Sequence, residues 1–297
     1  MTRRGWLLFA AMSIVWGLPY LLIRVSVVSV SPVFLVFGRT AIGAILLLPI
    51  AHLRGQLSPL LRRWRPLLAY TVVEIAVPWL LLSEAETRIT SSLAGLLVAA
   101  VPLVGTVMVA VAGRRERLGR VQLSGLLVGL AGVVAVLGFD FRTMTVVAGL
   151  EMAAVIVCYA AGPQILARRL ADLPSLGVVA ASLGLCALGY LPVAIIAAPR
   201  SLPPQRVLAA VLVLGVVCTA AAFILFFQLI ASIGAVRATV ITYVNPAVAV
   251  TLGAAVLHER FTAGIGFGFF LILAGSVLAN RVKAAPPPVT QTVVAES

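Results

Sequence analysis

The stretch PLVGTVMVAVAGRRERLGRVQLSGLLVGLAG, residues 102–132, returns as PAVAVTLGAAVLHERFTAGIGFGFFLILAG, residues 246–275. With a one-residue gap, the copies align Pro102 with Pro246, Glu116-Arg117 with Glu259-Arg260, Gly125 with Gly268, and Leu130-Ala131-Gly132 with Leu273-Ala274-Gly275. The same offset pairs Trp16 with Tyr159 and Pro49 with Pro192. Such a long-period duplication predicts two related halves, residues 1–140 and 141–283, before a proline-rich tail over 284–297 that we expect to be disordered.

The amino-acid composition indicates whether water or a lipid bilayer surrounds these two halves. The 297 residues are 62% hydrophobic and 10% charged, with a mean hydropathy of +1.15, whereas about 25% of the residues of an average protein are charged. A soluble fold is excluded, and the chain is expected to be an all-α integral membrane protein. Its only lysine is Lys283, so a phosphate-binding loop that ends in lysine, and with it ATP-driven pumping by this chain alone, is excluded.

Ten apolar segments have about the 20 residues that a membrane-spanning helix needs. They cover residues 6–27, 33–53, 66–83, 92–112, 118–138, 146–167, 176–198, 207–230, 235–257 and 261–280. Each half therefore contains five of these apolar segments. An odd number of spans inserts the second half upside down relative to the first, which is the inverted-repeat arrangement of carriers that work by alternating access.

The basic residues between the segments indicate the orientation. The N-terminus and alternate loops carry fifteen of them, and the loops on the other side carry six. Basic loops stay in the cytoplasm, so we expect both termini to be cytoplasmic, with the protein in the cell (inner) membrane. Because these arginines lie in short clusters between apolar runs, they predict topology and no nucleic-acid partner.

These motifs resemble the EamA-type family of the drug/metabolite transporter superfamily. The resemblance rests on Trp16-Gly17, Arg39, the run from Ser92-Leu93-Ala94 to Pro102, and Glu116-Arg117-Leu118, and on the second copy from Ala238 through Asn245-Pro246 to Leu273-Ala274-Gly275. It implies a cavity walled by spans one to four and six to nine, spans five and ten at the periphery, and export of amino acids, metabolites or drugs. The second copy departs from the first, with Ser182 at the position of Arg39.

Two ionisable residues within the spans are candidate binding groups, because charges inside a membrane are costly. Glu74 lies near the middle of span three and Arg39 lies in span two. Glu74 suits proton exchange or recognition of a cation, and Arg39 suits a substrate carboxylate. The alternatives are a structural role for Glu74, as a hydrogen-bonding partner of neighbouring helices, and a structural pair between Arg39 and Glu74. Glu151, at the start of span six, is more plausibly an interfacial residue.

Aromatic and amide side chains complete the expected binding site, since they combine apolar faces with hydrogen-bonding tips. The candidates are Trp16, Tyr20, Trp79, Tyr159, Tyr243 and Asn245. Pro102 and Pro246, matched between the halves, are candidate gating residues, because proline frees backbone carbonyls and kinks a helix. A static kink that aids packing is the alternative for each.

Small residues four apart, Gly125 with Gly129 and Gly264 with Gly268, permit close helix approach. They favour packing within the chain, and a homodimer face is the alternative. For Glu116 and Glu259 the expected role is structural, as caps of the following helix or in local ion pairs.

The function expected from these features is secondary transport of a small organic solute, with protons as a candidate coupling ion and the lipid bilayer as surroundings. A membrane-embedded enzyme is the first alternative, but the only aspartates, Asp140 and Asp172, lie in loops, and His52 and His258 lie at span ends on opposite sides. No catalytic triad or metal site follows from them, so no cofactor is expected. A membrane scaffold without transport is the second alternative, and no stretch of the sequence reads as a soluble interaction domain.

Overall fold

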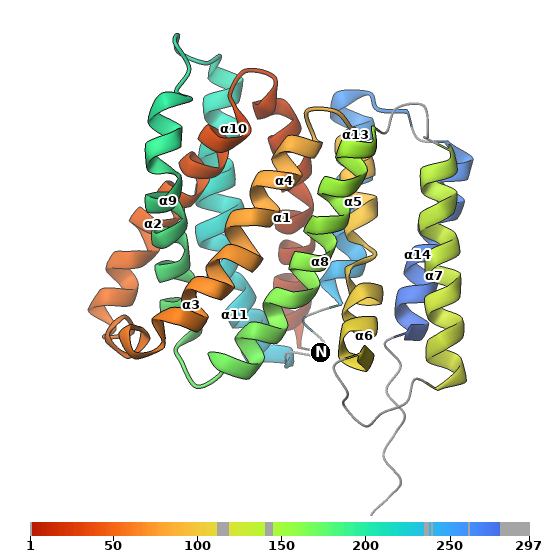
Figure 1. The fold of residues 1–297 in the computed structure, drawn as a ribbon, viewed down its shortest axis with the longest axis horizontal. Helices are drawn as coiled ribbons and strands as arrows, with labels where there is room; N and C mark the ends of the chain where they lie inside the picture. Colours follow the sequence, from red (N-terminus) through yellow and green to blue (C-terminus); the bar gives the residue numbers. More distant parts are fainter. Residues whose placement is uncertain are drawn as a thin grey trace, which may run out of the picture.

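The computed structural model describes residues 2–111, 119–139, 145–234, 238, 240–260 and 262–279. All regular secondary structure in these residues is helical, and the helices run between two ends of a bundle (Figure 1). We call the end that holds the N-terminus the N-terminal end and the other the opposite end. The tail over 284–297 lies outside the described residues.

The first half contains five spans, two of which are built from several helical segments. They are α1 (Arg3–Val27), α2 (Pro32–Leu53), a third span of η1 (Ser58–Arg63), α3 (Trp64–Tyr70), η2 (Thr71–Ala76) and α4 (Val77–Ala85), a fourth of α5 (Ser91–Val98) and α6 (Val101–Val111), and α7 (Arg120–Phe139). Three of them begin at side-chain caps, from Thr2, Ser31 and Thr90, which supply the acceptors that the first turn of a helix lacks.

The second half contains five spans in the same order, and each runs across the bundle in the direction opposite to its counterpart in the first half. It consists of α8 (Val146–Arg169), α9 (Ser175–Ile196), an eighth span of α10 (Gln205–Gly215), η3 (Val216–Ala221) and α11 (Ala222–Ile233), then α13 (Ile241–Leu257) and α14 (Ala263–Ala279). Helix α1 runs from the N-terminal end to the opposite end, whereas α8 runs back toward the N-terminal end (Figure 1). The predicted ten-helix fold of two inverted halves is thus confirmed.

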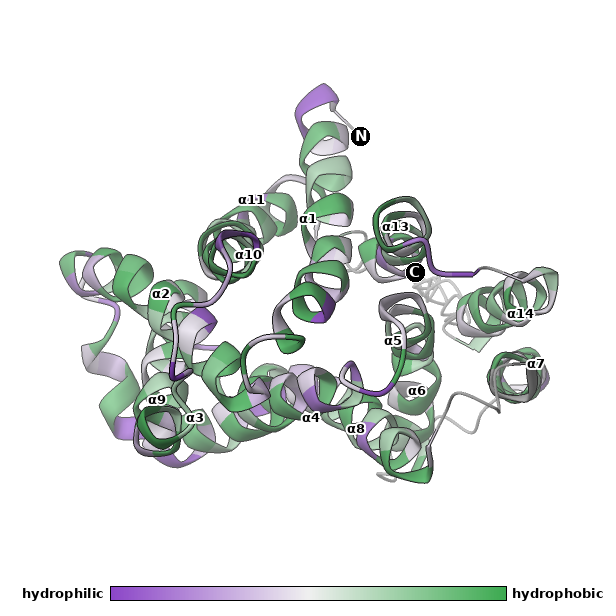
Figure 2. Cartoon of the chain, turned by 90° about the horizontal axis from the view of Figure 1, so that it is seen from above, coloured by the Kyte–Doolittle hydropathy of each residue, from purple (hydrophilic) through white to green (hydrophobic). Residues whose placement is uncertain are grey.

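Seven of these spans are long and apolar enough to cross a membrane, and three shorter apolar helices, over Arg120–Val136, Ile241–Leu257 and Ala263–Ala279, complete the set. In Figure 2 most of the helical ribbon has the colour of hydrophobic residues. Large apolar side chains such as Leu7, Ile45 and Leu127 are 62–72% exposed. Exposed apolar side chains on helices of this length fit a bilayer.

The third span of each half contains one turn of π-helix, η2 in the first half and η3 in the second. A π-turn inserts one extra residue into an α-helix and is frequent at functional sites. Glu74 lies in η2 and Thr219 lies in η3. The two irregular turns therefore occupy corresponding places in the halves, and both carry polar residues.

The matched prolines differ in their surroundings. Pro102 follows the break at Ala99 and Ala100 that divides the fourth span into α5 and α6, whereas Pro246 lies inside the uninterrupted helix α13. The kink expected at both positions is therefore a full break in one half only.

Helices α7 and α14 form a pair at the edge of the molecule (Figures 1 and 2). Their glycines allow close contact: a Cβ on Gly132 would come within 2.6 Å of the main-chain nitrogen of Ile272, and one on Gly125 within 2.8 Å of the Gly275 oxygen. The small-residue faces of α7 and α14 thus pack against each other within one chain.

Candidate functional site

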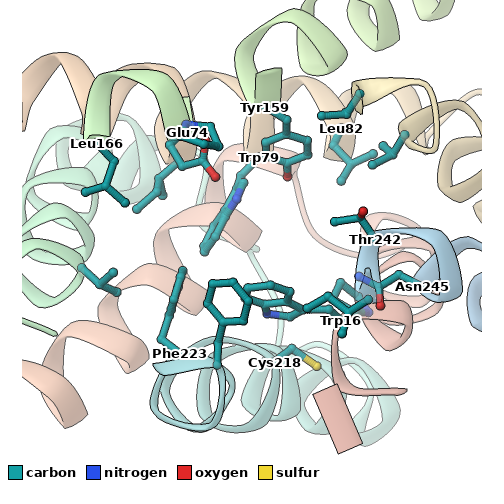
Figure 3. Close-up of a pocket in the computed structure, with 18 of the residues that line it drawn as sticks. Trp16, Glu74, Trp79, Leu82, Tyr159, Leu166, Cys218, Phe223, Thr242 and Asn245 are labelled. Atoms are coloured by element: carbon teal, nitrogen blue, oxygen red, sulfur yellow. The ribbon is translucent and has the colours of Figure 1, made fainter. Parts of the chain in front are cut away.

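A cavity of about 380 Å³ lies between the two halves (Figure 3). Its walls come from spans one to four and six to nine, and neither α7 nor α14 contributes to them. The lining residues are Trp16, Pro19, Tyr20, Arg39, Tyr70, Glu74, Ile75, Trp79, Leu82, Val98, Val101, Tyr159, Pro163, Leu166, Ser175, Val179, Cys218, Phe223, Phe226, Phe227, Ile241, Thr242, Asn245 and Pro246.

The cavity extends toward the N-terminal end of the bundle. Ser175, the exposed first residue of α9, belongs to its wall, as does Ile241, the first residue of α13. Toward the opposite end the lining stops at Tyr20 and Leu82, which join the buried core formed by α1, α4 and α5. The structure therefore shows a cavity that reaches one end of the bundle and is closed at the other.

Arg39 projects from α2 into this cavity and is 5% exposed. Its guanidinium carbon lies 3.6 Å from the centre of the Trp79 ring, a cation–π contact. One nitrogen donates to the hydroxyl of Thr219 at 3.3 Å, and Nε has no hydrogen-bond partner among the described residues. Arg39 is thus held in place but retains a free donor.

Glu74 lies across the same cavity wall, against α8. A Cβ on Gly162 would overlap Oε2 of Glu74 and would lie 2.9 Å from Cβ of Glu74, so only glycine leaves room for this carboxylate. Oε2 is buried and has no hydrogen-bond partner in the part of the chain that the structure describes. The ion pairs seen among those residues do not include Arg39 with Glu74, so the structural pair that we considered is not formed in this structure.

The aromatic residues form the apolar surface of the cavity. In Figure 3, Glu74, Trp79 and Tyr159 lie along one wall, and Trp16 and Phe223 along the facing wall. The ring of Trp16 packs against Phe226 at 4.6 Å and edge-on against Phe223 at 6.0 Å between ring centres. The sequence analysis missed the phenylalanines of α11, because Phe223, Phe226 and Phe227 fall in a uniformly apolar run with nothing to mark one face as the binding face.

Two predicted residues have roles that their sequence positions did not show. Asn245 lines the cavity, and in the orientation that satisfies its amide it donates to the carbonyl oxygens of Ile241 at 2.9 Å and Ser13 at 3.1 Å. It therefore links α13 to α1. Tyr243 does not line the cavity; its hydroxyl reaches the carbonyl oxygen of Ser276 on α14 at 3.5 Å. Tyr243 lies two residues before Asn245, and a helix turns its side chain to another face.

Of the two candidate gating residues, Pro246 lines the cavity and Pro102 does not, although the neighbouring Val101 does. Glu151 forms an ion pair with Arg88 at 2.8 Å at the opposite end of the bundle, in keeping with a residue at the membrane surface.

Glu259 differs from its expected role as a cap of the following helix. Its carboxylate accepts hydrogen bonds from the main-chain N–H groups of Ser91 and Ser92, each at 2.9 Å, and so caps α5 of the other half. The expectation of a local role was wrong because sequence proximity could not show which helix N-terminus lies nearest. Glu116, its counterpart, lies outside the described residues.

Comparison with known proteins agrees with this architecture. YedA of Escherichia coli, described as an uncharacterized inner membrane transporter, is 27% identical over 303 residues, which cover 97% of this chain and 94% of the relative, in strain K12 and equally in strains O6:H1 and O157:H7. A protein of known crystal structure, 23% identical in sequence, superposes with a TM-score of 0.67 over 94% of this chain and 97% of its own, and so shares the fold.

The family comparison is the most direct. The profile of the EamA-like transporter family matches residues 3–138 and again residues 148–281, which together span nearly all of the described helices. Transporters rather than enzymes make up this family, in line with the absence of a catalytic constellation in the sequence. The chain belongs to the EamA-like transporter family.

Proposed function

We propose that this protein exports a small amphipathic organic solute across the inner membrane by alternating access. The observation that carries the proposal is the cavity between the two halves, which reaches the N-terminal end and is closed at the opposite end. A cavity of about 380 Å³ lies in the range of small-molecule sites, about 300–1,000 Å³. Inverted halves around a central site are the arrangement that allows each side to open in turn.

The orientation follows from the basic residues. The sequence pattern assigns fifteen basic residues to the N-terminus and the alternate loops and six to the other loops, which supports a cytoplasmic position of the N-terminal end. The cavity then faces the cytoplasm, ready to receive a solute for export, and both termini are cytoplasmic. The halves that rock against each other are residues 1–140 and 141–283.

The charged groups in the cavity favour an amino-acid-like zwitterion. Arg39 offers an unpaired donor and has no carboxylate partner among the described residues, which suits a substrate carboxylate. Glu74 offers a buried oxygen that accepts no hydrogen bond from them, which suits an ammonium group. The rings of Trp16, Trp79 and Phe223 suit the apolar part of the solute.

Glu74 is also the residue that we propose for proton coupling. A buried carboxylate without a partner is far less costly when protonated than when ionised. In an exporter that exchanges protons for solute, binding of the ammonium group of the solute would displace this proton toward the cytoplasm. A proton taken up from outside would then drive the return of the empty carrier.

The test is transport by purified protein in liposomes, with a panel of apolar amino acids and amphipathic cations, with and without a proton gradient. We expect gradient-driven flux in the wild type and its loss in Glu74→Gln. Glu84→Gln is the matched control, because Glu84 lies at the end of the bundle beside Arg88 and outside the cavity. Gradient-driven flux in Glu74→Gln would contradict the coupling role, and no flux of any solute in the wild type would contradict the transport function.

A further inference from the structure

The opposite end of the bundle is closed by a direct contact between the halves. Besides the two main-chain bonds, the carboxylate of Glu259 accepts hydrogen bonds from the hydroxyls of Ser91, at 3.0 Å, and Ser92. Glu259 follows the fourth span of the second half and the serines begin the fourth span of the first. Opening this end by moving the halves apart must break the contact.

A second carboxylate lies behind this contact. Glu86, the C-cap residue that follows α4, is 0% exposed, and neither of its carboxylate oxygens has a hydrogen-bond partner among the described residues. Arg24 of α1 approaches it but donates to its main-chain carbonyl oxygen. Arg88, two residues on, is engaged by Glu151 and Glu84. Glu86 is therefore a buried acid without an ion pair in the part of the chain that the structure describes.

The charge state of Glu86 follows from this burial. An ionised carboxylate removed from water without a partner costs several kcal/mol, whereas the protonated acid costs much less. Burial raises the pKa of Glu86 well above its ordinary value; Glu259 raises it further, while Arg24 and Arg39 oppose the shift. Two further titratable groups, Tyr20 of α1 and Tyr159 of α8, lie near enough to interact electrostatically with Glu86. The closed end thus favours a neutral Glu86.

We propose that Glu86 is a proton-binding site that takes up a proton when the opposite end closes and releases it when that end opens. On closure a carboxylate oxygen accepts a proton from water at the opposite end; on opening the O–H bond breaks and the proton returns to that water. Acidity on that side then favours the state whose cavity faces the N-terminal end. The inference rests on the transport function proposed above, and gives the carrier a second proton-binding site besides Glu74.

The sign of the pH effect can be stated. The pKa of Glu86 is higher in the closed state, where the side chain is buried, than in a water-filled open state, where it returns toward the ordinary value of a glutamate. The closed state gains its full advantage below the open-state value and loses it as the pH rises through the closed-state value. Between the two values, the ratio of closed to open molecules falls about tenfold for each pH unit.

The test is a distance measurement by double electron–electron resonance in lipid nanodiscs. Spin labels are placed by Ser29→Cys in the first half and Arg260→Cys in the second, both exposed at the opposite end, after the native Cys158, Cys186 and Cys218 have been replaced by alanine. We expect a short distance at pH 5 and a growing population of longer distances toward pH 8. The measurement needs no solute, so its failure would leave the transport proposal standing.

The variants assign the effect to one residue. Glu86→Gln mimics the protonated acid and should hold the short distance at every pH, and Glu86→Met, which fills a similar volume, should do the same. Glu84→Gln should keep the pH response of the wild type, because Glu84 is already partly exposed and paired with Arg88. A wild type with one distance from pH 5 to 8 would overturn the proposal, and so would a Glu86→Gln or Glu86→Met protein that opens with the wild-type pH profile.

Discussion

Replacing Arg39 by methionine tests the binding site most directly. Methionine keeps most of the side-chain volume beside Trp79 but removes the charge, the cation–π contact at 3.6 Å and the bond to Thr219. If Arg39 binds a solute carboxylate, the variant loses a hydrogen bond to a charged group, which contributes about 1.5–3 kcal/mol. At 1.36 kcal/mol for each factor of ten, affinity should fall about 10- to 150-fold.

The assay compares two probes that differ only in the group that Arg39 is proposed to bind. Leucine carries a carboxylate, and 3-methylbutylamine is the same molecule without it. Binding is measured by the shift of the melting temperature with ligand concentration, since a ligand that binds only the folded state stabilises it by RT ln(1 + L/Kd), where L is the concentration of free ligand. We expect Arg39→Met to weaken leucine binding by the factor above and to leave amine binding within about threefold of the wild type.

Thr219→Val provides the matched control, because it removes the hydroxyl that holds Arg39 but leaves the guanidinium and its contact with Trp79. Its effect on leucine should be smaller than that of Arg39→Met. An equal loss for both probes in Arg39→Met would show a general collapse of the cavity, and an unchanged affinity for leucine would refute carboxylate binding by Arg39.

Three further experiments test other contacts of the structure. Gly162→Ala should displace the Glu74 carboxylate, with which its new Cβ would overlap, and weaken proton-driven flux more than passive binding, as measured in liposomes with and without a gradient. Gly132→Ala should force α7 away from the main chain of α14, with an overpacking cost of about 1–3 kcal/mol seen as a lower melting temperature; an unchanged melting temperature would show that the pair is loose. Joining cysteines at Ser91 and Glu259 with a short thiol crosslinker should hold the opposite end closed and stop transport until the link is cleaved, whereas continued flux would place the moving contact elsewhere.

The fold was predictable in detail because the membrane imposes it. Apolar runs of spanning length and a duplication with a constant offset are sufficient to give ten helices in two inverted halves. The breaks inside the spans were harder: proline marks the break before Pro102, but no residue type marks the π-turns at Thr71–Ala76 and Val216–Ala221. Such turns depend on how neighbouring helices pack.

The candidate site was predictable where its residues are rare in membrane spans. Arg39 and Glu74 stand out because charge in lipid is costly, and both line the cavity. Nothing in the sequence distinguishes Phe223 from the other residues of its apolar run, so only its packing against Trp16 in the structure identifies it as a site residue. Glu86 escaped notice because it lies at the end of a span, where an exposed carboxylate is ordinary, and only the structure shows that it is buried.

The pairing of α7 with α14 has a consequence for biosynthesis. Gly132 lies in α7, the fifth span of the first half. The main chain against which it packs, at Ile272, belongs to α14, the fifth span of the second half. At a synthesis rate of about 5–20 residues per second, α7 waits in the bilayer for roughly seven to thirty seconds before that partner emerges from the ribosome. A chain that stops before α14 leaves this glycine face open to lipid or to another chain, so assembly of the first half is finished only when α14 has been made.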